Sequence, residues 1–391
     1  MAFRNSKYLY DISVKINYFS IVNCLLSFVR CSLMKKTFLT GLRYVLFFGV
    51  GSGILWWLYT SQNTAFQAQL RLENKTPYPL YQKLFNDFKS ANFFWLIMTL
   101  AAFSFSNYSR AKRWNMLIIP LGFTPKIYNS FFAVNISYFT NLWMSRAGEV
   151  VRAGSLARAE GQSVTKIMGT VVVDRLLDLI SLALIVGFAF IIEYDTLWSW
   201  LDKNLGKGDG SFRFFKYPLF IALGILGFII CVILFIYRHH ILDLPLLNKL
   251  KPFAEKFSAG LKTIGKIKNL PLFIFHSVNI WLMYFLMTYF CFFAFAPTSH
   301  LGWLAALNVF VFGTFGMVIP SPGGMGTYHF LASSALSLYN IKGDDAFSFA
   351  NIMFFTIQIF YNVVAGLLSL YLINKLNKKS APVKVGVLTT Q

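Results

Sequence analysis

Long blocks of apolar residues dominate the chain and predict helices that cross a membrane. A helix needs about 20 mostly apolar residues to cross a hydrocarbon core about 30 Å thick. Seven stretches approach or reach that length: Tyr44–Tyr59, Asn92–Tyr108, Val171–Ile192, Tyr217–Tyr237, Leu272–Ala296, Leu301–Ile319 and Phe349–Ile373. We therefore expect an all-α polytopic membrane protein with about seven spanning or long apolar helices.

Two further apolar stretches are shorter and contain breaks. Ile127–Met144 and Met325–Tyr339 are interrupted by Asn, Ser, Thr and Gly residues and are bounded by Pro or charged residues. This pattern predicts half-helices or re-entrant segments. Asn135 and Asn308 each lead into a glycine-bearing element, which suggests an inverted repeat of the kind that transporters use to build a site between broken helices. Chance resemblance between apolar segments is the alternative.

Composition and charge support the membrane class and argue against a nucleic-acid partner. Hydrophobic residues make up 56% of the 391 residues, and 36 Lys and Arg face 15 Asp and Glu. Four basic clusters lie at the ends of apolar stretches: Lys35/Lys36/Arg43, Arg110/Lys112/Arg113, Lys249–Lys268 and Lys375/Lys378/Lys379. The positive-inside rule predicts that they are cytoplasmic anchors, so we expect a multi-pass protein of the inner (plasma) membrane with a cytoplasmic C-terminus.

The ends of the chain differ from its apolar middle. Met1–Leu33 is polar, aromatic and irregular, whereas Met34 begins a Lys-rich lead into an apolar run, so we expect residues 1–33 to be a non-native or disordered extension. Residues 34–375 form the expected transmembrane domain, and residues 376–391 a basic cytoplasmic tail. Leu246–Ile264 has apolar residues about three or four positions apart with lysines between them, which predicts a helix lying on the membrane surface.

Three ionisable residues lie inside the Val171–Ile192 stretch. Asp174, Arg175 and Asp178 would each cost about 2.5–3.5 kcal/mol at the centre of a membrane helix, so they need partners. At helical spacing all three fall on one side of the helix and can pair. They either line a polar cavity or lie near the cytoplasmic end, where they would only anchor or pair helices.

A second charged segment follows the first broken stretch. Arg146, Glu149 and Arg152 recur at helical spacing beside Gly148, so one helix face would carry two guanidinium groups around a carboxylate. Arg suits bidentate contact with a phosphate. A solvated cytoplasmic loop is the alternative.

Prolines and glycines interrupt the second broken stretch. Non-helical backbone at membrane depth is tolerated only where it is buried in protein or lines a water-filled cavity. Free N–H groups at the start of the following half-helix could bind a phosphate or carboxylate. A turn outside the membrane is the alternative. The residues concerned are Pro320, Pro322, Gly323, Gly324 and Gly326, followed by His329.

Enzymatic signatures are missing from the sequence. It contains no His-Glu-x-x-His, P-loop or Gly-x-Ser-x-Gly pattern. Cys24, Cys31, Cys231 and Cys291 lack metal-ligand spacing. We therefore expect a protein that is not an enzyme and has neither a cofactor nor a metal site.

Three segments in order carry a family resemblance: Arg146-Ala-Gly-Glu149-Val-Val-Arg152, Val173-Asp174-Arg175-Leu-Leu-Asp178 and Pro320-Ser-Pro-Gly-Gly-Met-Gly326. With them the chain resembles the lysylphosphatidylglycerol synthase transmembrane-region family, a flippase-like membrane domain family, over about Lys36–Lys375. The resemblance implies a lipid-translocating domain with re-entrant helices and membrane phospholipids as partners. It does not imply synthase activity, because no aminoacyltransferase domain follows Lys375.

Two departures from the family pattern bear on the headgroup. Asp174-Arg175 stands where the family often has Glu-Arg, which preserves the charge. His329 stands where the family usually has Glu, which leaves the headgroup preference open.

The resulting hypothesis is that an anionic or aminoacylated phospholipid headgroup binds in a polar cavity between the broken elements. The arginines 146, 152 and 175 would meet the phosphate. The acids 149, 174 and 178 would hold those arginines or a cationic headgroup, and the Gly323–Gly326 backbone would close the site. The alternatives are a secondary transporter of a small anionic solute, or a non-transporting membrane partner of an envelope-synthesis enzyme. Self-association into a homo-oligomer stays open.

Overall fold

The computed structural model describes residues 48–49, 51–72, 74, 76–144, 147–194, 267–319 and 321–377. Within those ranges the chain forms helices and turns and no strand. Several sequence predictions lie outside the described residues: the 1–33 extension, the Tyr217–Tyr237 span, the 246–264 surface helix, the tail beyond residue 377, and the residues Arg146 and Pro320.

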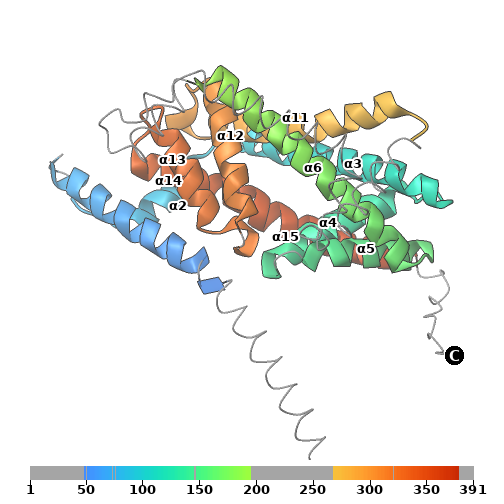
Figure 1. Cartoon of the computed structure of the whole chain (residues 1–391). Helices are drawn as coiled ribbons and strands as arrows, with labels where there is room; N and C mark the ends of the chain where they lie inside the picture. The colour runs from blue at the N-terminus through green and yellow to red at the C-terminus, as the bar shows by residue number, and fades with distance from the viewer. Residues whose placement is uncertain are drawn as a thin grey trace, which may run out of the picture.

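Within each described range, helices follow one another through short connections (Figure 1). The first covers residues 51–72. The others are α2 (Leu80–Ser90), α3 (Phe93–Ile118), α4 (Ile127–Trp143), α5 (Ala147–Glu160), α6 (Val164–Ile192), α11 (Leu270–Ala294), α12 (Trp303–Val318), α13 (Thr327–Ser337), α14 (Gly343–Phe354) and α15 (Asn362–Leu376). Short helical turns are η1 (Ile119–Leu121), η4 (Ala296–Thr298) and η5 (Pro322–Gly324), and a π-helix, η6 (Phe355–Tyr361), joins α14 to α15.

Three helices in the described ranges are long and apolar enough to cross a membrane: α6, α11 and the continuous helix Gly343–Leu376. A fourth span is possible if α2 and α3, which meet at 83°, are counted as one bent element. The sequence prediction of an all-α, multi-pass membrane protein is confirmed. Helix α12 has 16 residues and α13 has 11, so the two lie below the length of a full span.

Helix α3 is longer than the apolar stretch that predicted it. The stretch ends at Tyr108, but the helix continues to Ile118, because no proline or glycine occurs before Pro120 and Gly122. The extra turns carry Arg110 and Arg113 into the interior. The expectation that these two arginines are cytoplasmic anchors was therefore wrong, and their partners lie on α6.

The same order of elements occurs twice along the chain. A long helix, a short turn and a pair of short helices follow one another as α3–η1–α4–α5 and again as α11–η4–α12–α13. The long helices α3 and α11 pack against each other, and each short pair packs within itself. This is the element order that the predicted repeat requires.

Helix α13 approaches α12 closely because α12 carries glycines where they meet. A Cβ atom added at Gly316 would lie 2.7 Å from Cα of Tyr328, so no larger residue fits without backbone movement. Gly313 faces the ring of the same tyrosine. The pair α12 and α13, together with α14, contributes much of the largest apolar core.

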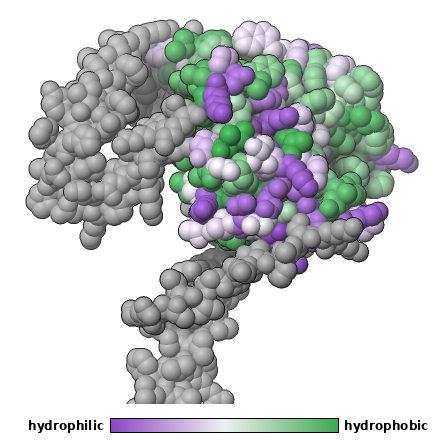
Figure 2. Space-filling view, turned by 90° about the vertical axis from the view of Figure 1, so that its right-hand side faces the viewer, coloured by the Kyte–Doolittle hydropathy of each residue, from purple (hydrophilic) through white to green (hydrophobic). Residues whose placement is uncertain are grey.

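Several helices begin or end at the same end of the molecule, and basic residues lie at these helix ends. Helices α3, α5 and α15 end there, and α4, α6 and α11 begin there, on the right-hand side of Figure 1. Figure 2 views this end and shows hydrophilic side chains interspersed with hydrophobic ones. Its described basic residues include Lys126, Arg158, Lys166, Lys268 and Lys375.

Candidate functional site

A network of buried ion pairs joins α3, α5 and α6. The carboxylate of Asp174 accepts hydrogen bonds from Arg113 Nη2 at 2.6 Å and from Arg152 Nη1 at 2.7 Å. Asp178 accepts from Arg110 Nη1 at 2.5 Å and from Arg113 Nη2 at 2.6 Å. Asp174 is fully buried and the Asp178 side chain is 13% exposed. The two aspartates therefore bind arginines of other helices, which the spacing within α6 does not reveal.

The network lies at the middle of a membrane helix. Helix α6 has 29 residues, about 43 Å at 1.5 Å per residue, and Asp178 has 14 residues of the helix on either side. An unpaired charge inside a membrane helix is costly, and ionisable groups buried there pair with one another and mark functional sites. The pairing with Arg110 and Arg113 offsets that cost.

Arg113 and Arg152 are the two fully buried arginines among the described members of the network. Their side chains are 0% and 1% exposed, and the Arg152 guanidinium lies 3.9 Å from the ring centre of Trp114. Cation–π contact and the ion pair to Asp174 together fix Arg152. The structure therefore places Arg152 and Asp174, both predicted site residues, in the buried support of the network.

Gly148 lies where α4 and α5 pack closely against each other. Its N–H donates to Asn141 Oδ1 at 2.9 Å, and a Cβ atom at this position would collide with the Ser137 carbonyl and the Asn141 side chain. Gly148 thus allows α5 to approach α4 and brings Glu149 beside α6.

Arg175 is held much less tightly than the other three arginines. Its side chain is 34% exposed, with Nε 3.3 Å from Glu149 Oε1 and Nη1 3.5 Å from Asp178 Oδ2. Neither contact has hydrogen-bond geometry, and Nε is a buried atom with no hydrogen-bond partner among the described residues. Arg175 is therefore the most exposed and the most loosely paired of the four arginines.

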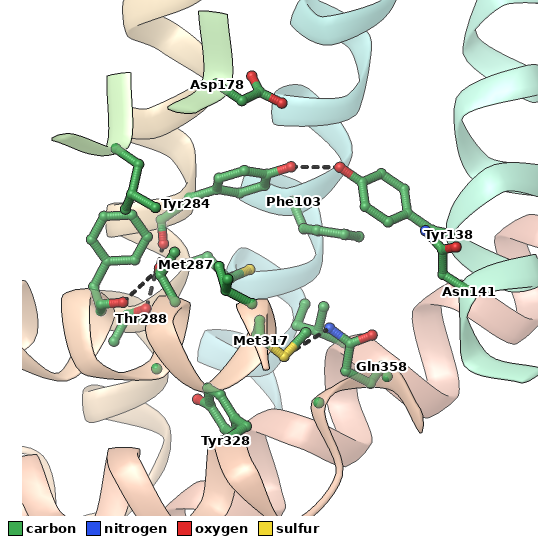
Figure 3. A pocket seen from close by; sticks show the side chains of 18 of the residues that line it. Phe103, Tyr138, Asn141, Asp178, Tyr284, Met287, Thr288, Met317, Tyr328 and Gln358 are labelled. Carbon is green, nitrogen blue, oxygen red and sulfur yellow. Dashed lines mark hydrogen bonds between the residues drawn. The ribbon is translucent and has the colours of Figure 1, made fainter. Parts of the chain in front are cut away.

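A cavity of about 760 Å³ begins at this arginine. Its charged end is formed by Arg110, Glu149, Arg175 and Asp178. Next along the cavity, the hydroxyls of Tyr138 and Tyr284 are hydrogen-bonded at 2.7 Å (Figure 3). The remaining wall is mainly apolar and includes Phe103, Leu179, Leu182, Trp281, Met287, Val309, Phe310, Met317, Val318, Ile319, Met353, Phe354 and Ile357.

The glycine-rich loop reaches the cavity with only part of its length. Gly323 and Gly324 line it, with φ angles of 55° and 82° that favour glycine. Pro322 begins η5 at this point. Gly326, at φ 81°, lies instead against the helix of residues 51–72, where a Cβ would meet Ile54 and Leu55.

His329 lies away from the cavity. It is 1% exposed, accepts a hydrogen bond from the Gly326 N–H at 3.3 Å and packs 4.7 Å from the Phe354 ring. Its contacts are those of a core residue that supports the glycine-rich loop. His329 stands where the family usually has Glu, and this difference therefore does not alter a group that faces the cavity.

Sequence reasoning missed several cavity residues. The sequence predicts Arg110 to be a basic anchor at the membrane surface. It gives no reason to single out four other residues that line the cavity: Tyr138, Asn141, Tyr284 and Gln358. A signal did exist for Arg110 and Arg113, because their spacing of three matches one helix face and Asp174 and Asp178 across the interior share one face as well. No comparable signal marks the tyrosines, since aromatic residues are common throughout the chain.

Comparison with known proteins places the chain among membrane proteins. It is 26% identical over 246 residues to the UPF0104 membrane protein MJ1078 of Methanocaldococcus jannaschii, a match that covers 61% of this chain and 95% of that protein. No solved structure matches it. The sequence profile of the lysylphosphatidylglycerol synthase TM region matches residues 80–365, which contain the whole charged network and the cavity. The chain therefore belongs to the lysylphosphatidylglycerol synthase TM region family.

Proposed function

We propose that this protein binds the phosphate of an anionic lipid headgroup at Arg175 and helps the lipid to cross the bilayer, without converting it chemically. The observation that carries the proposal is the loosely held Arg175 at the charged end of a largely apolar cavity. A guanidinium with free donors matches a phosphate, and an apolar wall matches acyl chains.

The charge of the network favours an anion. Its described members are four arginines (110, 113, 152 and 175) and three acids (149, 174 and 178), so one positive charge is uncompensated within them. At the middle of a membrane helix an uncompensated charge is costly, and an anionic ligand would neutralise it.

The cavity borders the apolar outer surface of the molecule. Leu179 on α6 is 61% exposed, and Val318 and Ile319 at the end of α12 are 55% and 42% exposed, yet all three line the cavity. Hydrocarbon chains can occupy such a lateral edge while the headgroup stays inside. This favours a lipid over a small solute enclosed on all sides.

Lipid exchange in proteoliposomes tests the proposal. The purified protein is reconstituted with a fluorescent anionic phospholipid, and its movement between leaflets is measured by quencher accessibility. We expect Arg175→Gln to abolish the exchange while insertion and thermal stability stay near wild type. Lys166→Gln is the matched control, because Lys166 is an exposed cation on the same helix.

Three outcomes separate the alternatives. Loss of exchange in Arg175→Gln alone supports the lipid function. Uptake of a soluble anion such as phosphate, with no lipid exchange, would favour the solute transporter. Activity in neither assay would favour the non-transporting partner of an envelope-synthesis enzyme, and it would contradict the proposal.

A further inference from the structure

The cavity contains a second polar element besides the charged end, and it consists of hydrogen-bond donors. Asn141 of α4 lines the cavity and accepts the Gly148 N–H with its Oδ1 atom. A backbone N–H can only donate, so the amide orientation is determined and Nδ2 is left as a donor. None of the described residues accepts a hydrogen bond from that Nδ2 atom, and the side chain is only half-buried.

Gln358 provides a similar donor further along. Its Oε1 atom accepts from Asn362 Nδ2 at 2.9 Å, and its Nε2 atom lies 3.9 Å from the sulfur of Met317, which is a weak acceptor. The π-helix η6 turns Ile357 and Gln358 toward the cavity while Phe355 and Phe360 remain exposed. In the view of Figure 3, Asn141 and Gln358 lie on the right, at heights between Asp178 above and Tyr328 below.

The carboxylate oxygens at the charged end of the cavity are either paired with arginines or buried. Both oxygens of Asp178 accept from arginines, Arg110 and Arg113. Oε1 of Glu149 faces Arg175, and its Oε2 atom is buried, so a cation in the cavity does not reach that oxygen.

We infer that the headgroup beyond the phosphate is uncharged and carries hydroxyl groups, and that aminoacylated, cationic headgroups bind more weakly. An ammonium group has three donors and no acceptor, so it cannot pair with the amide donors of Asn141 and Gln358. Hydroxyl and phosphate oxygens accept from both. This inference rests on the proposed function, because it names the class of lipid that the same cavity selects.

Binding to defined lipids tests the selectivity. The full chain, purified in detergent and stripped of lipid, is titrated with phosphatidylglycerol and with lysyl-phosphatidylglycerol, and bound lipid is measured by native mass spectrometry. We expect phosphatidylglycerol to bind about tenfold more tightly, the size expected for one hydrogen bond to a charged group. Arg175→Gln should weaken binding of phosphatidylglycerol.

Isosteric variants should remove the expected preference. Asn141→Asp and Gln358→Glu replace a donor by an acceptor and keep the oxygen that accepts from Gly148 or Asn362. We expect each to shift the binding ratio toward lysyl-phosphatidylglycerol by about tenfold. Gln82→Glu adds the same charge on the exposed surface of α2 and should leave the ratio unchanged.

The possible results distinguish this inference from the function on which it rests. If both lipids bind equally and Arg175→Gln weakens both, the selectivity is wrong and the lipid function stands. An unchanged ratio in Asn141→Asp and Gln358→Glu would also overturn the inference. If wild-type protein binds neither lipid and exchanges none, both proposals fail.

Discussion

Arg113 of α3 donates two hydrogen bonds to the carboxylate of Asp174 on α6, from Nη2 at 2.6 Å and from Nε at 3.0 Å. Both side chains are fully buried. The two residues are 61 positions apart in the chain. The network thus has a fully buried part, formed by Arg113, Arg152 and Asp174, and a part that lines the cavity, formed by Arg110, Glu149, Arg175 and Asp178.

Asp174→Asn should destabilise the fold. The change keeps the volume of the side chain but leaves Arg113 and Arg152 without their shared carboxylate in a buried site. Removing one partner of a buried pair typically costs about 3–5 kcal/mol. We expect a large fall in the thermal midpoint in detergent and reduced insertion.

Arg175→Gln should by contrast change stability by about 1 kcal/mol or less, since its two contacts are long and its side chain is one-third exposed. Equal losses in Asp174→Asn and Arg175→Gln would contradict the division of the network. Thermal unfolding of both variants, followed by the same fluorescence probe, makes this comparison.

Gly316→Ala should separate α13 from α12. The added methyl would meet the backbone of Thr327 and Tyr328, which cannot move aside as a side chain tip can. Overpacking of this kind costs about 1–3 kcal/mol, which thermal unfolding in detergent would detect. Gly169→Ala on α6 is the control, because no atom lies within 4 Å of its added methyl, and an unaltered midpoint in Gly316→Ala would contradict the close packing.

Lys83→Met should weaken the attachment of α2 to α14. Lys83 Nζ lies 2.6 Å from Asp87, 2.7 Å from Asp345 and 3.6 Å from Asp344, so its removal leaves three acids facing one another. We expect a loss of about 1–3 kcal/mol and faster proteolysis near residues 74–79. The exposed Lys89→Met on the same helix should have no such effect, and equal behaviour of the two variants would argue against the attachment.

Single cysteines at Lys268 and Ser299 should label from opposite sides of the membrane. Helix α11 lies between these two exposed positions and is long enough to span. In a background without the four native cysteines, impermeant thiol reagents should reach position 268 from the cytoplasm and position 299 from outside, because the basic helix ends gather at the former. Labelling of both from one side would contradict this orientation.

The amino-acid sequence by itself determined the membrane class and most helix positions. The reason is that the length of an apolar run reflects the thickness of the bilayer, a requirement that each segment meets locally. The same reasoning marked Asp174 and Asp178 as groups that need partners, because an unpaired charge inside a membrane helix is costly wherever the rest of the chain lies.

Only the tertiary structure decided which partners they have. Arg110 and Arg113 have the sequence appearance of surface anchors, and they become interior because α3 continues past Tyr108 and packs its last turns on α6. Likewise Arg152 and Arg175 are equally plausible phosphate ligands by residue type, yet one is covered by Trp114 and the other opens to the cavity. Burial depends on which helix faces meet, and that is a property of long-range packing that no local pattern of residues contains.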